Sequence, residues 1–98
     1  MPDVDVIAVI IAKLGSASKV ESALRDLVAP TRAEPGCISY ELYGSAASDT
    51  TFFTIEKWRT QADLDAHMQT PHIHAAFEAT ADHLAAAPGI HPLIPQHV

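Results

Sequence analysis

Basic side chains are scarce in this sequence. Six lysines and arginines stand against twelve acidic residues, which gives a formal net charge of −6, and the basic residues form neither a cluster nor a stripe. Proteins that bind nucleic acid concentrate positive charge to neutralise a run of phosphates. Nucleic acid is therefore excluded as an expected partner.

Several motif signals are also missing. Cys37 is the single cysteine, so the chain cannot form an internal disulfide or a thiol-based metal site. There is no glycine-rich phosphate loop, dinucleotide fingerprint, G-x-S-x-G elbow or H-E-x-x-H. No basic leader pattern and no run of about 20 apolar residues is seen. We expect a cytoplasmic protein with no membrane contact, and any catalysis must rest on few residues.

Apolar residues, in contrast, are plentiful. They make up 48% of the 98 residues, which is rich for a chain that has room for one domain, over residues 1–98, with one core. This excess predicts apolar surface beyond what a monomer buries. We expect a homo-oligomer.

Hydrophobic periodicity predicts the element order β-α-β-β-α-β. The expected strands cover residues 4–12, 37–43, 50–58 and 90–94, and the expected helices cover residues 18–33, a short helix from residue 60, and residues 71–87. This order predicts an α+β ferredoxin-like βαββαβ fold, an antiparallel sheet with helices on one face. The first strand is apolar on both faces, so we expect the open face to pack on a second copy as a homodimer.

Local signals predict where the first helix begins and ends. Ser18 and Glu21 form a capping-box pattern at its start, and Pro30 is expected to bend or loosen its last third without ending it. The helix should stop at Glu34-Pro35-Gly36, because the residue before proline avoids the α region and Gly36 supplies a free turn conformation. The corner is interpreted as architecture without chemistry.

Glu56, Trp58 and His67 are the main candidates for chemistry. Glu56 and Trp58 lie two apart in a strand and share a face, so a carboxylate lies beside a large apolar ring. His67 flanks the apolar stripe of the short helix. Each polar group has two open interpretations, an acid or base in a pocket or a structural hydrogen-bond partner.

A metal site is not expected from the histidines. His72 and His74 are two apart on a helix and point in different directions. The break at residues 70–71 disturbs the helical phase between His67 and His74, and His74 lies one turn from Glu78 as a surface residue. Cys37 at a strand start is typical of a small buried hydrophobe.

The spacing of these residues resembles the antibiotic biosynthesis monooxygenase family, and within it the small quinol monooxygenase-like members. The residues that carry the resemblance are Arg32, Glu34, Pro35, Gly36, Cys37, Tyr40, Glu41, Leu42, Glu56, Trp58, His67, Thr70, Pro71 and His72. The resemblance implies a dimeric α/β barrel with a pocket in each subunit. It also implies oxidation of a small aromatic quinol or phenol by O₂ without a cofactor.

The resemblance implies a role for each candidate. His67 is expected to be the base, with Glu56 orienting it or binding a substrate hydroxyl. Trp58 is expected to form a flat wall, and Tyr40 or Ser39 a polar substrate contact. The haem-degrading branch of the family is disfavoured, because the position of its axial histidine is Phe77 here, which becomes a candidate substrate contact. The asparagine of its first strand is also missing from residues 4–12.

Two other functions stay open. One is an isomerase of a small phosphorylated carbonyl compound, which the few basic residues near the expected pocket disfavour. The other is a non-catalytic dimer that binds a small molecule. The fold alone does not separate these functions.

Overall fold

Four antiparallel strands form one sheet in the computed structural model, which describes residues 3–97. The strand order is β2-β3-β1-β4. The strands are β1 (Val4–Ile11), β2 (Cys37–Gly44), β3 (Thr51–Trp58) and β4 (Gly89–Pro92). The two central strands pair along their whole length, from Val4 opposite Trp58 to Ile11 opposite Thr51. The proline-containing β4 lies at an edge, as predicted, where a missing backbone N–H removes no ladder hydrogen bond.

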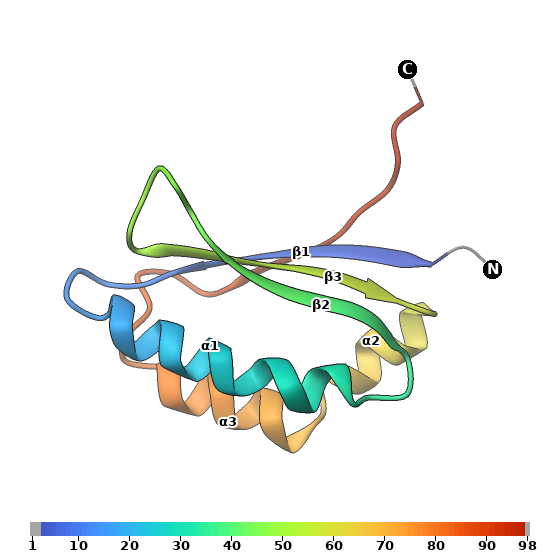
Figure 1. Cartoon of the computed structure of the whole chain (residues 1–98), viewed down its shortest axis with the longest axis horizontal. Coiled ribbons are helices and arrows are strands. Elements are labelled where there is room, and N and C mark those ends of the chain that lie inside the picture. Colours follow the sequence, from blue (N-terminus) through green and yellow to red (C-terminus); the bar gives the residue numbers. More distant parts are fainter. Residues whose placement is uncertain (1–2, 98) are drawn as a thin grey trace.

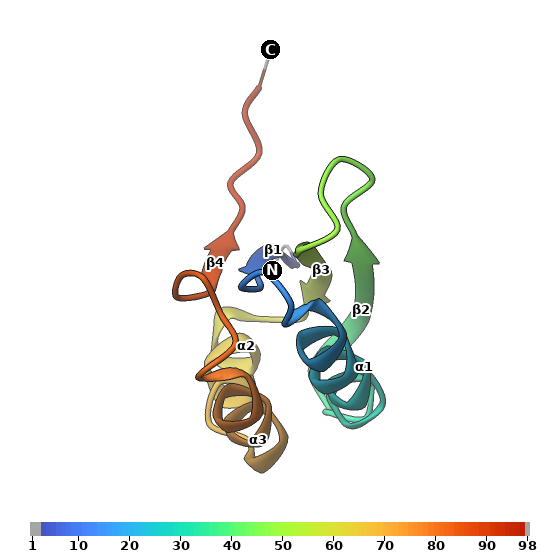
Figure 2. The same ribbon diagram turned by 90° about the vertical axis from the view of Figure 1, so that its left-hand side faces the viewer.

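Three helices cover one face of this sheet (Figures 1 and 2). They are α1 (Ala17–Arg32), α2 (Gln61–His67) and α3 (Pro71–Thr80). The predicted ferredoxin-like arrangement is confirmed, with the second helical segment divided at Thr70-Pro71 as expected. Within residues 3–97, no helix combines the length and the apolar character that a bilayer crossing requires.

The core lies between the sheet and the helices. On β3 the even-numbered residues face inward and are buried, whereas Ile55 on the other face is 43% exposed. Phe52 and Trp58 therefore share the inner face, because alternate residues of a strand point to the same side. They belong to two core clusters, one around Trp58 with Val6, and one around Phe52 with Val20.

The ends of two helices differ from the prediction. α1 begins at Ala17, so the N-cap is Ser16, two residues before the predicted cap Ser18. The Ser16 hydroxyl makes no cap bond and instead lies 3.0 Å from Nδ1 of His83. α1 continues through Pro30 to Arg32. α3 ends at Thr80, so the expectation of helix to residue 87 was wrong. The segment after α3 instead joins the end of β1, since Lys13 N donates to His83 O at 2.8 Å and Ala85 N donates to Ile11 O at 2.8 Å.

Two details of the corner before β2 also differ. Gly36 does not have a positive φ, so a free turn conformation is not why glycine stands there. A Cβ at this position would overlap the carboxyl group of Asp63 in α2, so the requirement is space. In β2, the pairing register shifts between Cys37 and Ser39, and Ile38 at the shift is 47% exposed whereas Tyr40 is 2% exposed.

Candidate functional site

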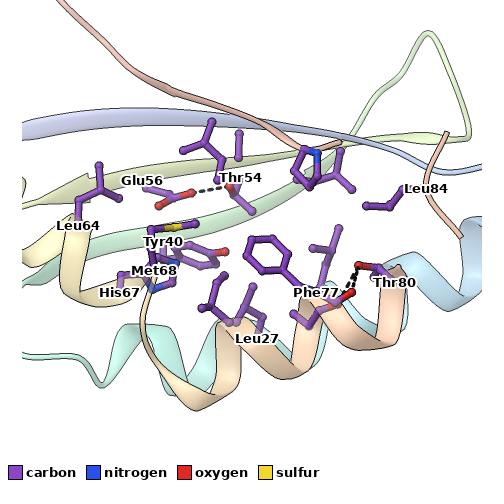
Figure 3. A pocket seen from close by; sticks show the side chains of 17 residues that line it. Leu27, Tyr40, Thr54, Glu56, Leu64, His67, Met68, Phe77, Thr80 and Leu84 are labelled. Carbon is purple, nitrogen blue, oxygen red and sulfur yellow. Dashed lines mark hydrogen bonds between the residues drawn. The ribbon is translucent and has the colours of Figure 1, made fainter. Parts of the chain in front are cut away.

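A largely apolar pocket lies between the inner face of the sheet and the helices (Figure 3). Its apolar lining comes from β1, β4, all three helices and the segments next to them. These residues are Ala8, Ile10, Leu24, Leu27, Leu64, Met68, Ile73, Ala76, Phe77, Leu84, Pro88 and Ile90. The remaining lining residues are Tyr40, Thr54, Glu56, His67 and Thr80. No lysine or arginine lines the pocket, so its interior offers no fixed positive charge.

Four of the polar side chains gather at one end of the pocket. Figure 3 shows Glu56 and Thr54 of β3 above Tyr40 of β2, with His67 of α2 beneath them. The strands place the first three there because Tyr40 pairs with Glu56 across the ladder and both face inward. Polar groups that converge in an otherwise apolar cavity are the usual form of a small-molecule site.

Glu56 is buried at 6% exposure, and each of its two carboxylate oxygens accepts one hydrogen bond from its own strand. The Thr54 hydroxyl donates to Oε2 at 2.6 Å, and the Trp58 indole Nε1 donates to Oε1 at 2.9 Å. These bonds offset the cost of burying a carboxylate. Among the described residues, no hydrogen bond joins Glu56 to His67, so the orienting role expected for Glu56 falls to another acid.

That acid is Glu34, in the corner between α1 and β2. Nδ1 of His67 donates to Oε2 of Glu34 at 2.6 Å, and His67 itself is 2% exposed. The imidazole packs against Trp58, with ring centroids 4.7 Å apart. Because Nδ1 is turned to Glu34, which does not line the pocket, Nε2 is the ring nitrogen left for the pocket.

Glu34 also binds a second imidazole. Nε2 of His72, at the start of α3, donates to the same Oε2 at 2.7 Å. The sequence interpretation missed both Glu34 and His72, because it assigned Glu34 to the helix stop and compared His72 only with His74. A usable signal was present: a buried histidine needs a partner, and the corner before β2 must approach α2 because β2 pairs with the strand that leads into α2.

Tyr40 remains a neutral hydrogen-bonding group. Burial raises the pKa of its phenol, and the nearby charge of Glu56 raises that pKa further, while a hydrogen bond with Thr54 opposes the shift. Tyr40 is therefore available as a proton donor to a bound ligand and does not act as a base. The Cys37 thiol is also kept protonated, because burial and then the Glu34 and Glu56 charges raise its pKa, which fits an inert cysteine.

Of the three other residues predicted to contact substrate, only Phe77 lines the pocket. Phe77 lines the pocket, and Figure 3 shows its ring reaching from α3 into the space between the layers. Trp58 is fully buried behind Glu56 and His67 and does not line the pocket. Ser39 lies on the strand position next to Tyr40, hence on the opposite face, and is also outside the lining. Trp58 thus supports the site, and Ser39 is not part of it.

The cavity between these side chains is small. Its volume is about 50 Å³, whereas an engineered apolar cavity that binds benzene measures about 150 Å³. An aromatic ligand therefore requires side chains to move. Phe77, at 37%, is the most exposed aromatic side chain of the lining.

Known proteins are similar to this chain in sequence and in fold. The family model for antibiotic biosynthesis monooxygenase matches residues 4–79. The Mycobacterium tuberculosis protein named "Putative monooxygenase Rv0793" is 39% identical over 70 residues, which cover 70% of this chain and 67% of that protein. Its solved structure superposes with a TM-score of 0.88 at 30% identity and covers 99% of this chain and 98% of that chain.

Two further matches extend the comparison. The crystal structure of PA3566 from Pseudomonas aeruginosa has a TM-score of 0.91 at 34% identity, with 99% of this chain and 97% of that chain covered. "Uncharacterized protein sll1783" from Synechocystis is 47% identical over 58 residues, which span 59% of this chain but only 40% of that relative. The chain belongs to the antibiotic biosynthesis monooxygenase family.

Proposed function

We propose that this protein is a monooxygenase that oxidises a small aromatic quinol or phenol with O₂ in the pocket, without a cofactor. The observation that carries the proposal is a buried imidazole, His67, held by Glu34 at 2.6 Å at the polar end of an apolar cavity. Family membership and the relative named a putative monooxygenase support the reaction class. The aromatic substrate and the use of O₂ are the proposal's own.

The chemistry requires little from the protein. Ground-state O₂ is a triplet and reacts slowly with paired electrons, but a phenolate is electron-rich enough to transfer one. His67 takes the phenol proton at Nε2, and the Glu34 carboxylate stabilises the imidazolium that forms. One oxygen atom enters the ring and the other leaves as water with two hydrogens of the substrate, so a phenol and O₂ give a quinone and H₂O. The substrate supplies all the electrons.

The other polar groups position the substrate. Glu56 has lone pairs beyond those used by Thr54 and Trp58, and accepts a hydrogen bond from a second substrate hydroxyl. The protonated Tyr40 phenol donates to the oxygen that becomes anionic. The apolar lining surrounds the ring and limits water during the reaction.

Phe77 is the proposed gate for the substrate. The cavity of about 50 Å³ opens when this ring turns toward solvent, and the ring then forms one wall beside the bound substrate. Phe77→Ala is expected to lower KM for the larger quinols of a panel more than for one-ring quinols. Equal KM values for Phe77→Ala and the parent across the panel contradict the gate.

The alternatives gain less support. A phosphorylated substrate needs positive groups, but the pocket lacks lysine and arginine and contains the buried Glu56. A non-catalytic ligand-binding role does not require a carboxylate-paired imidazole at the polar end of the pocket. The cytoplasmic location stays a prediction.

We also propose a homodimer formed through the open face of the sheet. The face away from the helices carries exposed apolar side chains, including Ile11, Tyr43 and Ile55, which are 38%, 54% and 43% exposed. The segment after β4 extends away from the sheet on that same side (Figures 1 and 2), with Ile94 81% exposed. A second copy would cover both.

Oxygen consumption tests the function. The purified protein is incubated with one- to three-ring quinols and phenols in ¹⁸O₂, and products are analysed by mass spectrometry. We expect O₂ uptake above autoxidation and one ¹⁸O per product, with His67→Ala slowed by about 10²- to 10⁴-fold. His74→Ala, an exposed histidine of α3, is the matched control. Uptake equal to autoxidation across the panel contradicts the proposal, and a His67→Ala rate equal to the parent removes the base.

A further inference from the structure

Three potential metal ligands converge just outside the pocket. Nδ1 of His67, Nε2 of His72 and a carboxylate oxygen of Glu34 all lie within 4.8 Å of one another. We propose that these three side chains bind a divalent first-row transition ion, with Zn²⁺ as the representative. The proposal does not rest on the proposed oxidation, but the ligands include the proposed base His67 and its partner Glu34, so a bound ion would take the place of their hydrogen bond.

The fold brings together residues that the sequence separates. Glu34 comes from the corner before β2, His67 ends α2, and His72 is the second residue of α3. Residues five apart on one continuous helix would point about 140° from each other. The break between α2 and α3 removes this restriction, and the Thr70 hydroxyl stabilises the break by donating to His67 O at 2.8 Å and accepting from Ile73 N at 3.3 Å.

The donor set is suited to transition metals. Two imidazole nitrogens and one carboxylate oxygen form the ligand set of several zinc sites and of non-haem iron sites, both of which keep a position for water. Calcium and magnesium prefer all-oxygen sites. The sequence predicts no metal site, because His72 was compared only with His74, and His67 likewise only with His74; the residue that lies close to His72 is His67.

Small adjustments make the geometry suitable. Oε2 of Glu34 now accepts from both nitrogens, at 2.6 Å and 2.7 Å. Donor atoms around a tetrahedral ion with bonds of about 2.1 Å lie about 3.4 Å apart. Rotation of the Glu34 carboxylate opens these distances, and the ion takes the place of the two N–H groups, with each neutral imidazole then carrying its proton on the other ring nitrogen.

The three ligands differ in exposure, and the most exposed of them gives a metal ion access from solvent. The side chain of His67 is 3% exposed, that of Glu34 is 12% exposed and that of His72 is 22% exposed. An ion can therefore arrive from the solvent side at His72 and reach a mostly desolvated position, where its attraction to the carboxylate is stronger than in water. Of the three ligands, only His67 also lines the pocket, so the ion would lie beside the pocket and not inside it.

Calorimetric titration with Zn²⁺ tests the site. The protein is prepared without a polyhistidine tag, stripped with a chelator, and titrated with ZnCl₂; Co²⁺ absorption in the visible range reports coordination directly. We expect one ion per chain. Removal of one ligand in His72→Ala or Glu34→Gln should weaken binding by more than the roughly 10- to 100-fold that follows loss of a second-shell partner.

His74→Ala is the matched control, because it removes an exposed histidine from the same helix. It should bind Zn²⁺ as the parent does and give the same Co²⁺ spectrum. Circular dichroism of each variant separates loss of ligands from loss of folding, and the partly exposed His72 is the ligand whose removal least disturbs the core. Absence of binding to the parent, or equal binding by the parent and folded His72→Ala, overturns the proposal.

Discussion

A carboxylate that holds a buried imidazole determines which ring nitrogen carries the proton. Glu34 accepts from Nδ1 of His67 and so keeps Nε2 free for the pocket. Glu34→Gln retains the size of the side chain but removes the charge that stabilises the imidazolium. We expect kcat to fall by about 10- to 100-fold, less than on loss of the base itself, with KM unchanged.

Steady-state turnover in the presence of EDTA measures this effect without interference from bound metal. Glu78→Gln is the matched control, since Glu78 is an exposed acid of α3. A purely structural role for Glu34 predicts a loss of folded protein at unchanged kcat per folded molecule. That result would contradict Glu34 as a positioning residue.

The buried phenol of Tyr40 makes folding sensitive to alkaline pH. An unfolded tyrosine ionises near pH 10, whereas burial and the Glu56 charge raise the pKa of Tyr40 in the folded protein. Above pH 10 the unfolded state therefore binds fewer protons than the folded state. The contribution to stability is complete below this pH and is lost as the pH rises toward the folded pKa, by up to about 1.4 kcal/mol per pH unit.

Urea unfolding at pH 9 to 11 measures this dependence. Tyr40→Phe should lower the slope of stability against pH, and Tyr43→Phe, which changes a 54% exposed tyrosine on the other sheet face, should not. Equal slopes for the two variants would show that Tyr40 ionises in the folded protein as it does in the unfolded chain.

The corner between α1 and β2 and the start of α2 are packed as one unit. Gly36 lies against Asp63, whose amide is capped by the Thr60 hydroxyl at 3.1 Å, and Gly36 O accepts from Arg59 N at 3.0 Å. Gly36→Ala should force Asp63 out of its position and disturb the cap, which costs about 1–3 kcal/mol. Thermal unfolding measures the loss. Gly44→Ala is the control, because a Cβ there meets nothing within 4 Å, and equal melting temperatures of the two variants would contradict the close packing.

Periodicity was sufficient for the elements but not for their ends. The order of strands and helices and the shared face of Glu56 and Trp58 on β3 follow from patterns along the sequence, so both were predicted correctly. The end of α3 was predicted wrongly. The residues after Thr80 have a sequence compatible with helix, but they leave the helix and Leu84 pairs with Ala12 at the end of β1. Such a tertiary hydrogen bond leaves no local signal.

The candidate site was predictable where it depends on spacing within one element, and not where it depends on contacts between elements. His67, Glu56, Tyr40 and Phe77 line the pocket because spacing along one element determines which side chains face inward. Glu34 was missed because its role depends on contact between two corners 33 residues apart along the chain. For Trp58 the prediction that it shares a face with Glu56 was correct. Whether a side chain on that face lines the cavity or is buried behind other side chains depends on the packing of the folded core, which the strand pattern does not show.

The molecule as a whole has one covered and one open sheet face. Helices cover the inner face, while Ile55 and Tyr43 on the outer face are 43% and 54% exposed. The segment after β4 extends away from the sheet on the same side as that outer face (Figure 2). Apolar patches of this kind on a small domain mark interaction surfaces. Because β2 and β3 contribute residues to both faces, an interface on the outer face would also restrain the strands that carry Tyr40 and Glu56.

A charge at the centre of that face should separate the copies. Light scattering coupled to size-exclusion chromatography should give twice the chain mass of 10.5 kDa for the parent. Ile55→Lys should shift the protein toward the single-chain mass, because a desolvated lysine without a partner opposes association. Leu14→Lys is the control, since Leu14 is 94% exposed in the turn after β1, away from the face. A parent mass of one chain, or an unchanged mass for folded Ile55→Lys, would contradict assembly through this surface.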